Sequence, residues 1–198
     1  MLKRIILSFL FLITFPSVYS QFTIQPLIIS PTGIYGVYLN KSPGFRFGRL
    51  YDFENRWRIR LLGSLAYFIP RKNTFNVAGV EESYIVTVHS GTKSIKLFAN
   101  IEFSSGMDIK IVEKGLFSWY AGFDVPIGGN LSRIEVNIPG IVNSGETLTS
   151  IYVGFRGRTG IEFELEDHIL FLEIDRTYSM GAENFVLNYN TLGIGITF

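Results

Sequence analysis

Cysteine is absent from this 198-residue sequence, and histidine occurs only twice. The chain therefore has no disulfide framework and no thiolate chemistry, and its stability must come from noncovalent interactions. Long apolar runs are also missing: after the first 20 residues, no segment approaches the roughly 20 consecutive apolar residues that a membrane-spanning helix needs. These absences argue against a disulfide-stapled scaffold and against a helical membrane protein.

Net charge is nearly absent as well. Of the 18 lysines and arginines, Lys3 and Arg4 lie at the N-terminus, and the other 16 stand against 17 aspartates and glutamates. Such a balance creates no global field that would attract nucleic acid or a strongly acidic partner. We therefore expect no nucleic-acid partner.

The N-terminal segment has the pattern of a secretory signal peptide. Lys3 and Arg4 precede an apolar run, and the small residue Ser20 stands just before the expected cleavage point. The apolar run is short for a transmembrane helix, although a retained anchor is the alternative interpretation. We expect residues 1–20 to be removed after export and residues 21–198 to form a single domain.

The mature sequence alternates between apolar and polar residues, and it contains 20 glycines and 15% aromatic residues, which favours β-structure. Its last segment shows the pattern clearly, because Leu192, Ile194, Ile196 and Phe198 occupy every second position. A period of two residues indicates a strand. The same pattern predicts eight strands, at 33–40, 45–53, 57–69, 95–111, 117–127, 151–165, 170–178 and 189–198.

The connections between these strands alternate in length. Short turns are expected at about 54–56, 112–115 and 165–168, and longer loops at about 71–94, 128–149 and 179–188. Only the first connection, at 40–44, is short where a long one is expected. This arrangement predicts an all-β fold: an eight-stranded antiparallel up-and-down transmembrane β-barrel with short periplasmic turns and longer extracellular loops.

Charged residues fall on the strand face opposite the apolar stripe. They are Arg46, Asp52, Arg58, Arg60, Lys96, Glu102, Asp108, Lys110, Asp124, Arg156, Arg158, Glu162, Glu164, Glu173 and Asp175. An eight-stranded barrel has an interior just wide enough to be filled by side chains, so these seven cations and eight anions would pair inside it. In a soluble β-sandwich, the alternative, the same face would meet water.

The sequence resembles small outer-membrane β-barrel proteins of the OmpA/OmpX-like type, and is most similar to the β-barrel domain proteins of Bacteroidetes. The resemblance covers the mature chain and rests on the signal peptide, the alternating strands, the segment 160–165 before a tight turn, and the C-terminal segment 192–198. It implies that Ile194, Ile196 and Phe198 form the signal read by the barrel-assembly machinery. It also implies an outer-membrane location in contact with outer-membrane lipid.

Catalytic and metal-binding patterns are weak. His89 falls in an expected outer loop and His168 in a turn at the opposite rim, so the two histidines do not have the spacing of a metal site. Lipid A deacylases are barrels that use a histidine and a serine two positions on, but that position here is Leu170. The carboxylates of Glu162 and Glu164 are better explained as partners of lumen arginines than as an acid and base pair. We expect no catalytic, cofactor or metal site.

Three functions remain open at this stage. The first is a non-enzymatic outer-membrane barrel that supports the cell envelope or binds an extracellular protein or surface ligand through its loops. The second is a narrow pore or a transporter of small hydrophobic ligands. The third is a soluble secreted β-sandwich that acts as a binding module.

Overall fold

The computed structural model describes residues 20–53, 56–80, 86–138, 142–181 and 187–198. At positions 34, 72–95, 136, 138 and 142–144 it describes the backbone only. The predicted signal peptide lies outside these residues, except that Ser20 begins the first strand.

Within the described ranges the chain forms nine strands and one short helix. In order they are β1 (Ser20–Thr32), α2 (Ile34–Tyr38), β2 (Ser42–Phe53), β3 (Trp57–Tyr67), β4 (Lys72–Val80), β5 (Val86–Lys114), β6 (Phe117–Ile138), β7 (Val142–Leu165), β8 (His168–Gly181) and β9 (Asn188–Thr197). None of the described helices is long and apolar enough to cross a membrane.

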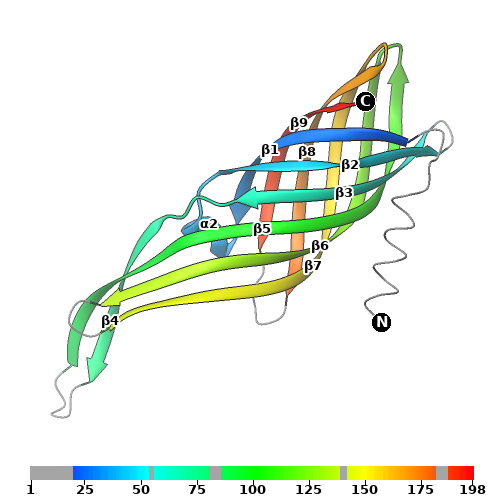
Figure 1. Cartoon of the computed structure of the whole chain (residues 1–198). Helices are drawn as coiled ribbons and strands as arrows, with labels where there is room; N and C mark the ends of the chain where they lie inside the picture. Colours follow the sequence, from blue (N-terminus) through cyan, green and yellow to red (C-terminus); the bar gives the residue numbers. More distant parts are fainter. Residues whose placement is uncertain (1–19, 54–55, 81–85, 139–141, 182–186) are drawn as a thin grey trace, which may run out of the picture.

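Eight of these strands close into an antiparallel barrel. From β5 to β9 each strand pairs with the next strand in the chain. β9 then pairs with β1, β1 with β2, and β2 with β3. The ring closes because β3 pairs with β5 from Trp57–Ile109 to Tyr67–Ala99. β4 lies outside the ring and pairs only with the first part of β5. The predicted fold class, a closed eight-stranded antiparallel barrel, is confirmed (Figure 1).

The position of the first strand was predicted wrongly. The segment 33–40 is a connection that contains helix α2, whereas the first strand is Ser20–Thr32. The alternation in β1 cannot be recognised in the sequence, because inward and outward positions are both apolar toward the C-terminal end of the strand. Leu27 and Ile29 point inward and are buried, while Ile28 between them points outward and is exposed. With this correction the connection from β1 to β2 is long, and the anomaly in the predicted alternation of loop lengths disappears.

Two predicted loops are largely strands. Within 71–94 lie β4 and the start of β5, and within 128–149 lie the end of β6 and the start of β7. These segments extend β5, β6 and β7 beyond the barrel, at the lower left of Figure 1. In these extensions the strands pair through backbone hydrogen bonds, but the sequence lacks the regular apolar alternation that makes strands recognisable.

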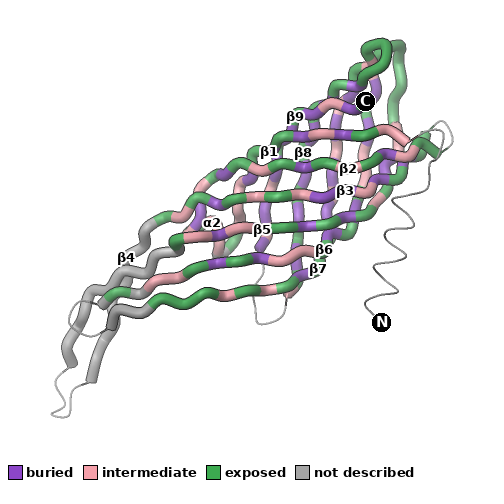
Figure 2. The backbone as a smooth tube through the Cα atoms, in the orientation of Figure 1, coloured by how far each residue is buried: buried purple, intermediate pink, exposed green. Residues whose placement is uncertain are grey.

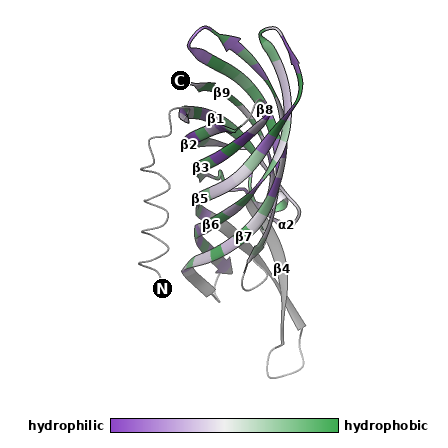
Figure 3. Ribbon diagram, turned by 90° about the vertical axis from the view of Figure 1, so that its right-hand side faces the viewer, coloured by the Kyte–Doolittle hydropathy of each residue, from purple (hydrophilic) through white to green (hydrophobic). Residues whose placement is uncertain are grey.

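The distribution of side chains is inverted relative to a soluble protein. Along β8, Leu172 and Ile174 are exposed on the outside, while Glu173 and Asp175 between them are buried inside. Figure 2 shows this alternation of buried and exposed positions along the strands, and Figure 3 shows hydrophobic and hydrophilic residues interleaved in the same way. The buried core is therefore the barrel lumen, and most of it is polar.

Candidate functional site

Glu173 on β8 is the centre of the lumen. Its Oε1 accepts a hydrogen bond of 2.8 Å from Arg46 Nη1 on β2, and its Oε2 accepts bonds from Arg60 Nη1 on β3 and, at 2.7 Å, from Tyr120 Oη on β6. Arg46 also donates to Asp175 Oδ2 at 2.9 Å. One carboxylate therefore links strands from opposite walls of the barrel.

A second layer lies nearer the long-loop end. Arg156 on β7 donates through Nη2 to Glu102 Oε1 on β5 and through Nε to Thr177 Oγ1 at 2.9 Å. The other oxygen of Glu102 accepts hydrogen bonds from Tyr152 Oη at 2.8 Å and from Tyr189 Oη at 2.6 Å. Each charged group in this layer thus has partners from more than one strand.

A third set of contacts joins Arg158 to two aspartates. Its Nε donates to Asp108 Oδ1 at 2.6 Å, and its Nη1 donates to Asp124 Oδ2. Arg60 reaches the other oxygen of Asp108 at 3.3 Å, which connects this set to Glu173. Arg156 lies 3.6 Å from Asp124 Oδ1 and 3.6 Å from Asp175 Oδ1, so these three sets form one continuous network.

The short-turn end of the lumen carries two smaller groups. Arg58 donates to Glu162 Oε1 and, at 2.7 Å, to Asp52 Oδ1. Nearby, Lys110 Nζ lies 3.6 Å from Glu164 Oε1, and the Glu164 side chain is 41% exposed. These pairs mark the transition from the buried lumen to the exposed rim.

The buried charges nearly balance. Five arginines (Arg46, Arg58, Arg60, Arg156 and Arg158) and six carboxylates (Glu102, Asp108, Asp124, Glu162, Glu173 and Asp175) are buried. Unpaired charges would be very costly in such a place, so a nearly neutral and interconnected set is the arrangement that a closed lumen tolerates. Glycines make room for it: a Cβ on Gly160 would come within 2.5 Å of Tyr120 Oη.

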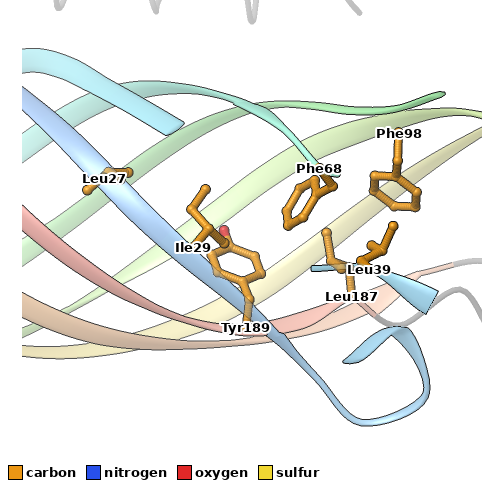
Figure 4. Packing of buried hydrophobic residues seen from close by; sticks show 7 residues of the cluster. All are labelled: Leu27, Ile29, Leu39, Phe68, Phe98, Leu187 and Tyr189. Carbon is orange, nitrogen blue, oxygen red and sulfur yellow. The ribbon is translucent and has the colours of Figure 1, made fainter. Parts of the chain in front are cut away.

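An apolar cluster closes the lumen at the long-loop end. It consists of Leu27, Ile29, Leu39, Phe68, Phe98, Leu187 and Tyr189, and Figure 4 shows these side chains converging inside the barrel. We call this cluster the cap. Tyr35 of α2 packs against it, with its ring 5.8 Å from that of Phe98, and burial raises the pKa of Tyr35 to about 12.

Backbone hydrogen bonds hold the α2 connection across the barrel end. Asn40 N donates to Ile69 O at 2.7 Å, and Arg71 N donates to Tyr38 O at 2.7 Å. Ser42 Oγ accepts from Ile69 N at 2.8 Å. The connection after β1 is therefore tied to the segment that follows β3, and the cap is part of the fold.

The structure brings most of the predicted lumen charges together, but not all of them. Lys96 is an exception: it lies on the extension of β5, where its half-exposed side chain pairs with Glu135 at 3.3 Å. The predicted alternation continued past the barrel end, where no lumen exists to receive the side chain. Lys110, Glu164 and Asp52 lie at the opposite rim and are partly exposed.

The predicted lumen network contained charged residues only and left out its tyrosines, although the alternation places Tyr120 and Tyr152 on the charged strand face. Tyr120, Tyr152 and Tyr189 are buried and donate hydrogen bonds to lumen carboxylates. The available signal was their position, since Tyr120 and Tyr152 each lie four residues before a lumen charge, Asp124 and Arg156, and therefore on the same strand face.

The remaining predicted residues are the two histidines and the C-terminal residues, of which His89 lies on the part of β5 that pairs with β4 beyond the barrel. The side chain of His89 is not described; His168 begins β8, and its ring lies 5.2 Å from that of Phe198. Ile194 and Phe198 are exposed on the outward face of the closing strand β9, and Ile196 lies on the same face. A role of these three residues in assembly stays a prediction.

The fold and the lumen together define a class of protein. A closed antiparallel barrel with apolar side chains outside and a polar interior has the organisation of a transmembrane β-barrel, and eight strands give the smallest size at which side chains fill the interior. The soluble β-sandwich is excluded as a fold, because the charged faces of the strands face one another inside a single closed sheet.

Solved structures of this class are similar to the chain. The crystal structure of Neisserial surface protein A (NspA) matches with a TM-score of 0.55 and 16% sequence identity, over 90% of this chain and 95% of that one. Ail, the attachment invasion locus protein of Yersinia pestis, matches with a TM-score of 0.48 and 18% identity over 90% and 95% of the two chains. No protein-family model and no curated sequence matches the chain. The likeness to NspA establishes the barrel fold.

Proposed function

We propose that this protein is a non-enzymatic barrel of the bacterial outer membrane, and that it holds a β-sheet at the cell surface for binding a partner. The observation that carries the proposal is the inverted side-chain distribution. Large apolar residues of the barrel strands such as Ile174 and Ile194 are 54% and 64% exposed on the outside, while the arginines on the opposite strand face are buried. A hydrocarbon environment makes this distribution stable, whereas water would not.

The filled lumen supports a structural role over transport. The ionic network and the cap lie across the barrel one after the other, and both are built from side chains of several strands. A pore or a hydrophobic-ligand path would require both layers to open. We therefore expect no ion conductance in planar bilayers.

The protruding sheet supports a binding role. β7 pairs with β6 along its whole length, from Ile138–Val142 onward, but with β8 only from Tyr152 onward. The edge of β7 from Val142 to Ile151 therefore has backbone groups without a neighbouring strand within the described sheet. Such an edge can accept an extended peptide segment by β-strand addition.

Membrane location and orientation can be tested with single-cysteine variants, because the natural sequence contains no cysteine. Thr147→Cys lies in β7 on the protruding sheet, and Leu116→Cys lies at the tight turn of the opposite rim; both positions are exposed. A membrane-impermeant maleimide added to intact cells is expected to label the Thr147→Cys variant alone. After lysis it should label both.

Fractionation completes the test. The protein is expected to remain with outer membranes after a carbonate wash and to migrate differently on gels before and after boiling. Release by carbonate, or unchanged mobility, would contradict the membrane barrel. Labelling of Leu116→Cys on intact cells would contradict the orientation.

A further inference from the structure

Arg176 on β8 is a cation on the outward face of the barrel. Its neighbours on that face are apolar or aromatic: Ile174 is 54% exposed, Tyr178 48% and Met180 70%. The five buried arginines all have carboxylate partners, but no carboxylate lies within ion-pair distance of Arg176 in the part of the chain that the structure describes. An unpaired cation on a lipid-facing surface is unfavourable unless it reaches an anion at the membrane interface.

The side chain is directed toward the long-loop rim. The guanidinium carbon of Arg176 lies over the ring of Tyr178, 4.9 Å from its centroid. Tyr178 is two residues further toward that rim, which on a tilted strand is a rise of about 5 Å. Stacking on an aromatic ring orients the guanidinium and leaves its outer N–H groups available.

A shallow groove surrounds this arginine. It has a volume of about 520 Å³, and its outward-facing lining includes Gly157, Thr159, Ile174, Arg176 and Asn190. Arg158 and Asp175 also line it, but their charged groups pair inside the lumen, with Asp108 and Arg46. Gly157 and Asn190 are the cross-strand neighbours of Arg176 on β7 and β9. A Cβ on Gly157 would meet no atom within 4 Å, so the space beside the guanidinium is open.

We propose that this groove binds the phosphate group of a lipid headgroup in the outer leaflet. The guanidinium of Arg176 would donate to two phosphate oxygens, the amide of Asn190 is a further donor, and the lipid chains would lie along the exposed apolar residues below. The charge of the ligand is complementary to the one outward-facing cation of the groove. The inference rests on the membrane location proposed above, which determines that a lipid and not a soluble anion fills the site.

The test compares variants of the full-length barrel in detergent by native mass spectrometry. The probes are diphosphoryl lipid A and the same lipid after enzymatic removal of its phosphates. Arg176→Gln removes the charge, Arg176→Lys keeps the charge but not the planar fork, and Arg133→Gln removes one exposed charge from the protruding sheet. Each variant is first shown to be heat-modifiable and to insert into vesicles.

Arg176→Gln is expected to weaken binding of the phosphorylated lipid by about tenfold or more, since it removes charge-assisted hydrogen bonds. Arg176→Lys should give an intermediate loss, and Arg133→Gln should bind as the unaltered protein does. The dephosphorylated lipid should bind weakly to all of them, and millimolar inorganic phosphate should not displace the lipid.

Equal binding by Arg176→Gln and the unaltered protein would overturn the lipid site while leaving the outer-membrane function intact, because insertion is measured separately. Displacement by inorganic phosphate would also overturn it, since the site would then be one for a free anion. Failure of every variant to insert into vesicles would instead contradict the proposed function itself.

Discussion

Replacing Glu173 by glutamine tests whether the lumen network stabilises the barrel. The substitution keeps the shape of the side chain but removes the charge that faces Arg46 and Arg60, and it places amide hydrogens where an oxygen now accepts. Two hydrogen bonds to charged groups contribute about 1.5–3 kcal/mol each. Removing one partner from a buried ion pair costs about 3–5 kcal/mol. We therefore expect Glu173→Gln to lower the free energy of unfolding by about 3–5 kcal/mol.

The assay is urea unfolding of the barrel in phospholipid vesicles. Trp57 and Trp119 are both outward-facing and 42% exposed, so their fluorescence reports transfer from lipid to water. Gel mobility of unboiled samples gives an independent measure of the folded fraction. Agreement of the two midpoints is required before a free energy is derived.

The matched control is Glu135→Gln on the protruding sheet. Glu135 also pairs with two cations, Lys96 at 3.3 Å and Arg133 at 3.7 Å, but its side chain is 35% exposed. Exposed pairs contribute at most about 1 kcal/mol, so this variant should unfold almost as the unaltered protein does. If Glu173→Gln lost no more stability than Glu135→Gln, the idea that a dry ionic core holds the barrel together would be wrong.

Three further predictions, one of them with a matched control substitution, test other parts of the structure. Gly160→Ala, whose Cβ would lie 2.5 Å from Tyr120 Oη, should cost about 1–3 kcal/mol in the same unfolding assay, whereas Gly157→Ala, on the open outward face, should cost little. Phe98→Ala in the cap should lower the free energy of unfolding by about 3–5 kcal/mol. Planar bilayers containing this variant should still not conduct ions, because the ionic layers still cross the lumen. Measurable conductance would show that the cap is the main seal. Phe198→Ala should reduce the amount of heat-modifiable protein in cells without preventing refolding of the purified chain in detergent, and equal amounts in cells would contradict an assembly role.

The strand pattern was readable from sequence wherever the outward residues are apolar and the inward residues carry paired charge. In β8 the alternation of Leu172, Ile174 and Tyr178 with Glu173 and Asp175 identified both faces correctly. The rule fails when the inward residue is also apolar. Leu27 and Ile29 belong to the cap and not to the lipid face, so β1 looked like an unpatterned apolar run.

The partners of each lumen charge could not be predicted from sequence. Arg156 on β7 meets Glu102 on β5, which is 54 residues away, because both strands pair with β6 and the shear of the barrel brings the two side chains to the same level. Alternation assigns a residue to a face, but it does not give its height along the axis. For the same reason Lys96 was placed in the lumen, although it lies beyond the level at which the ring of strands ends.

The cap and the protruding sheet are two consequences of unequal strand lengths. β1, β2, β3, β8 and β9 stop near the level of the cap, where the α2 connection crosses the barrel end, while β5, β6 and β7 continue with β4 alongside (Figure 1). The sheet therefore rises from one side of the rim only and does not form a collar around the opening. Among the described residues no barrel strand stands opposite this sheet, and the edge of β7 from Val142 to Ile151 has no neighbouring strand on its outer side, which is the geometry that a strand-adding partner requires.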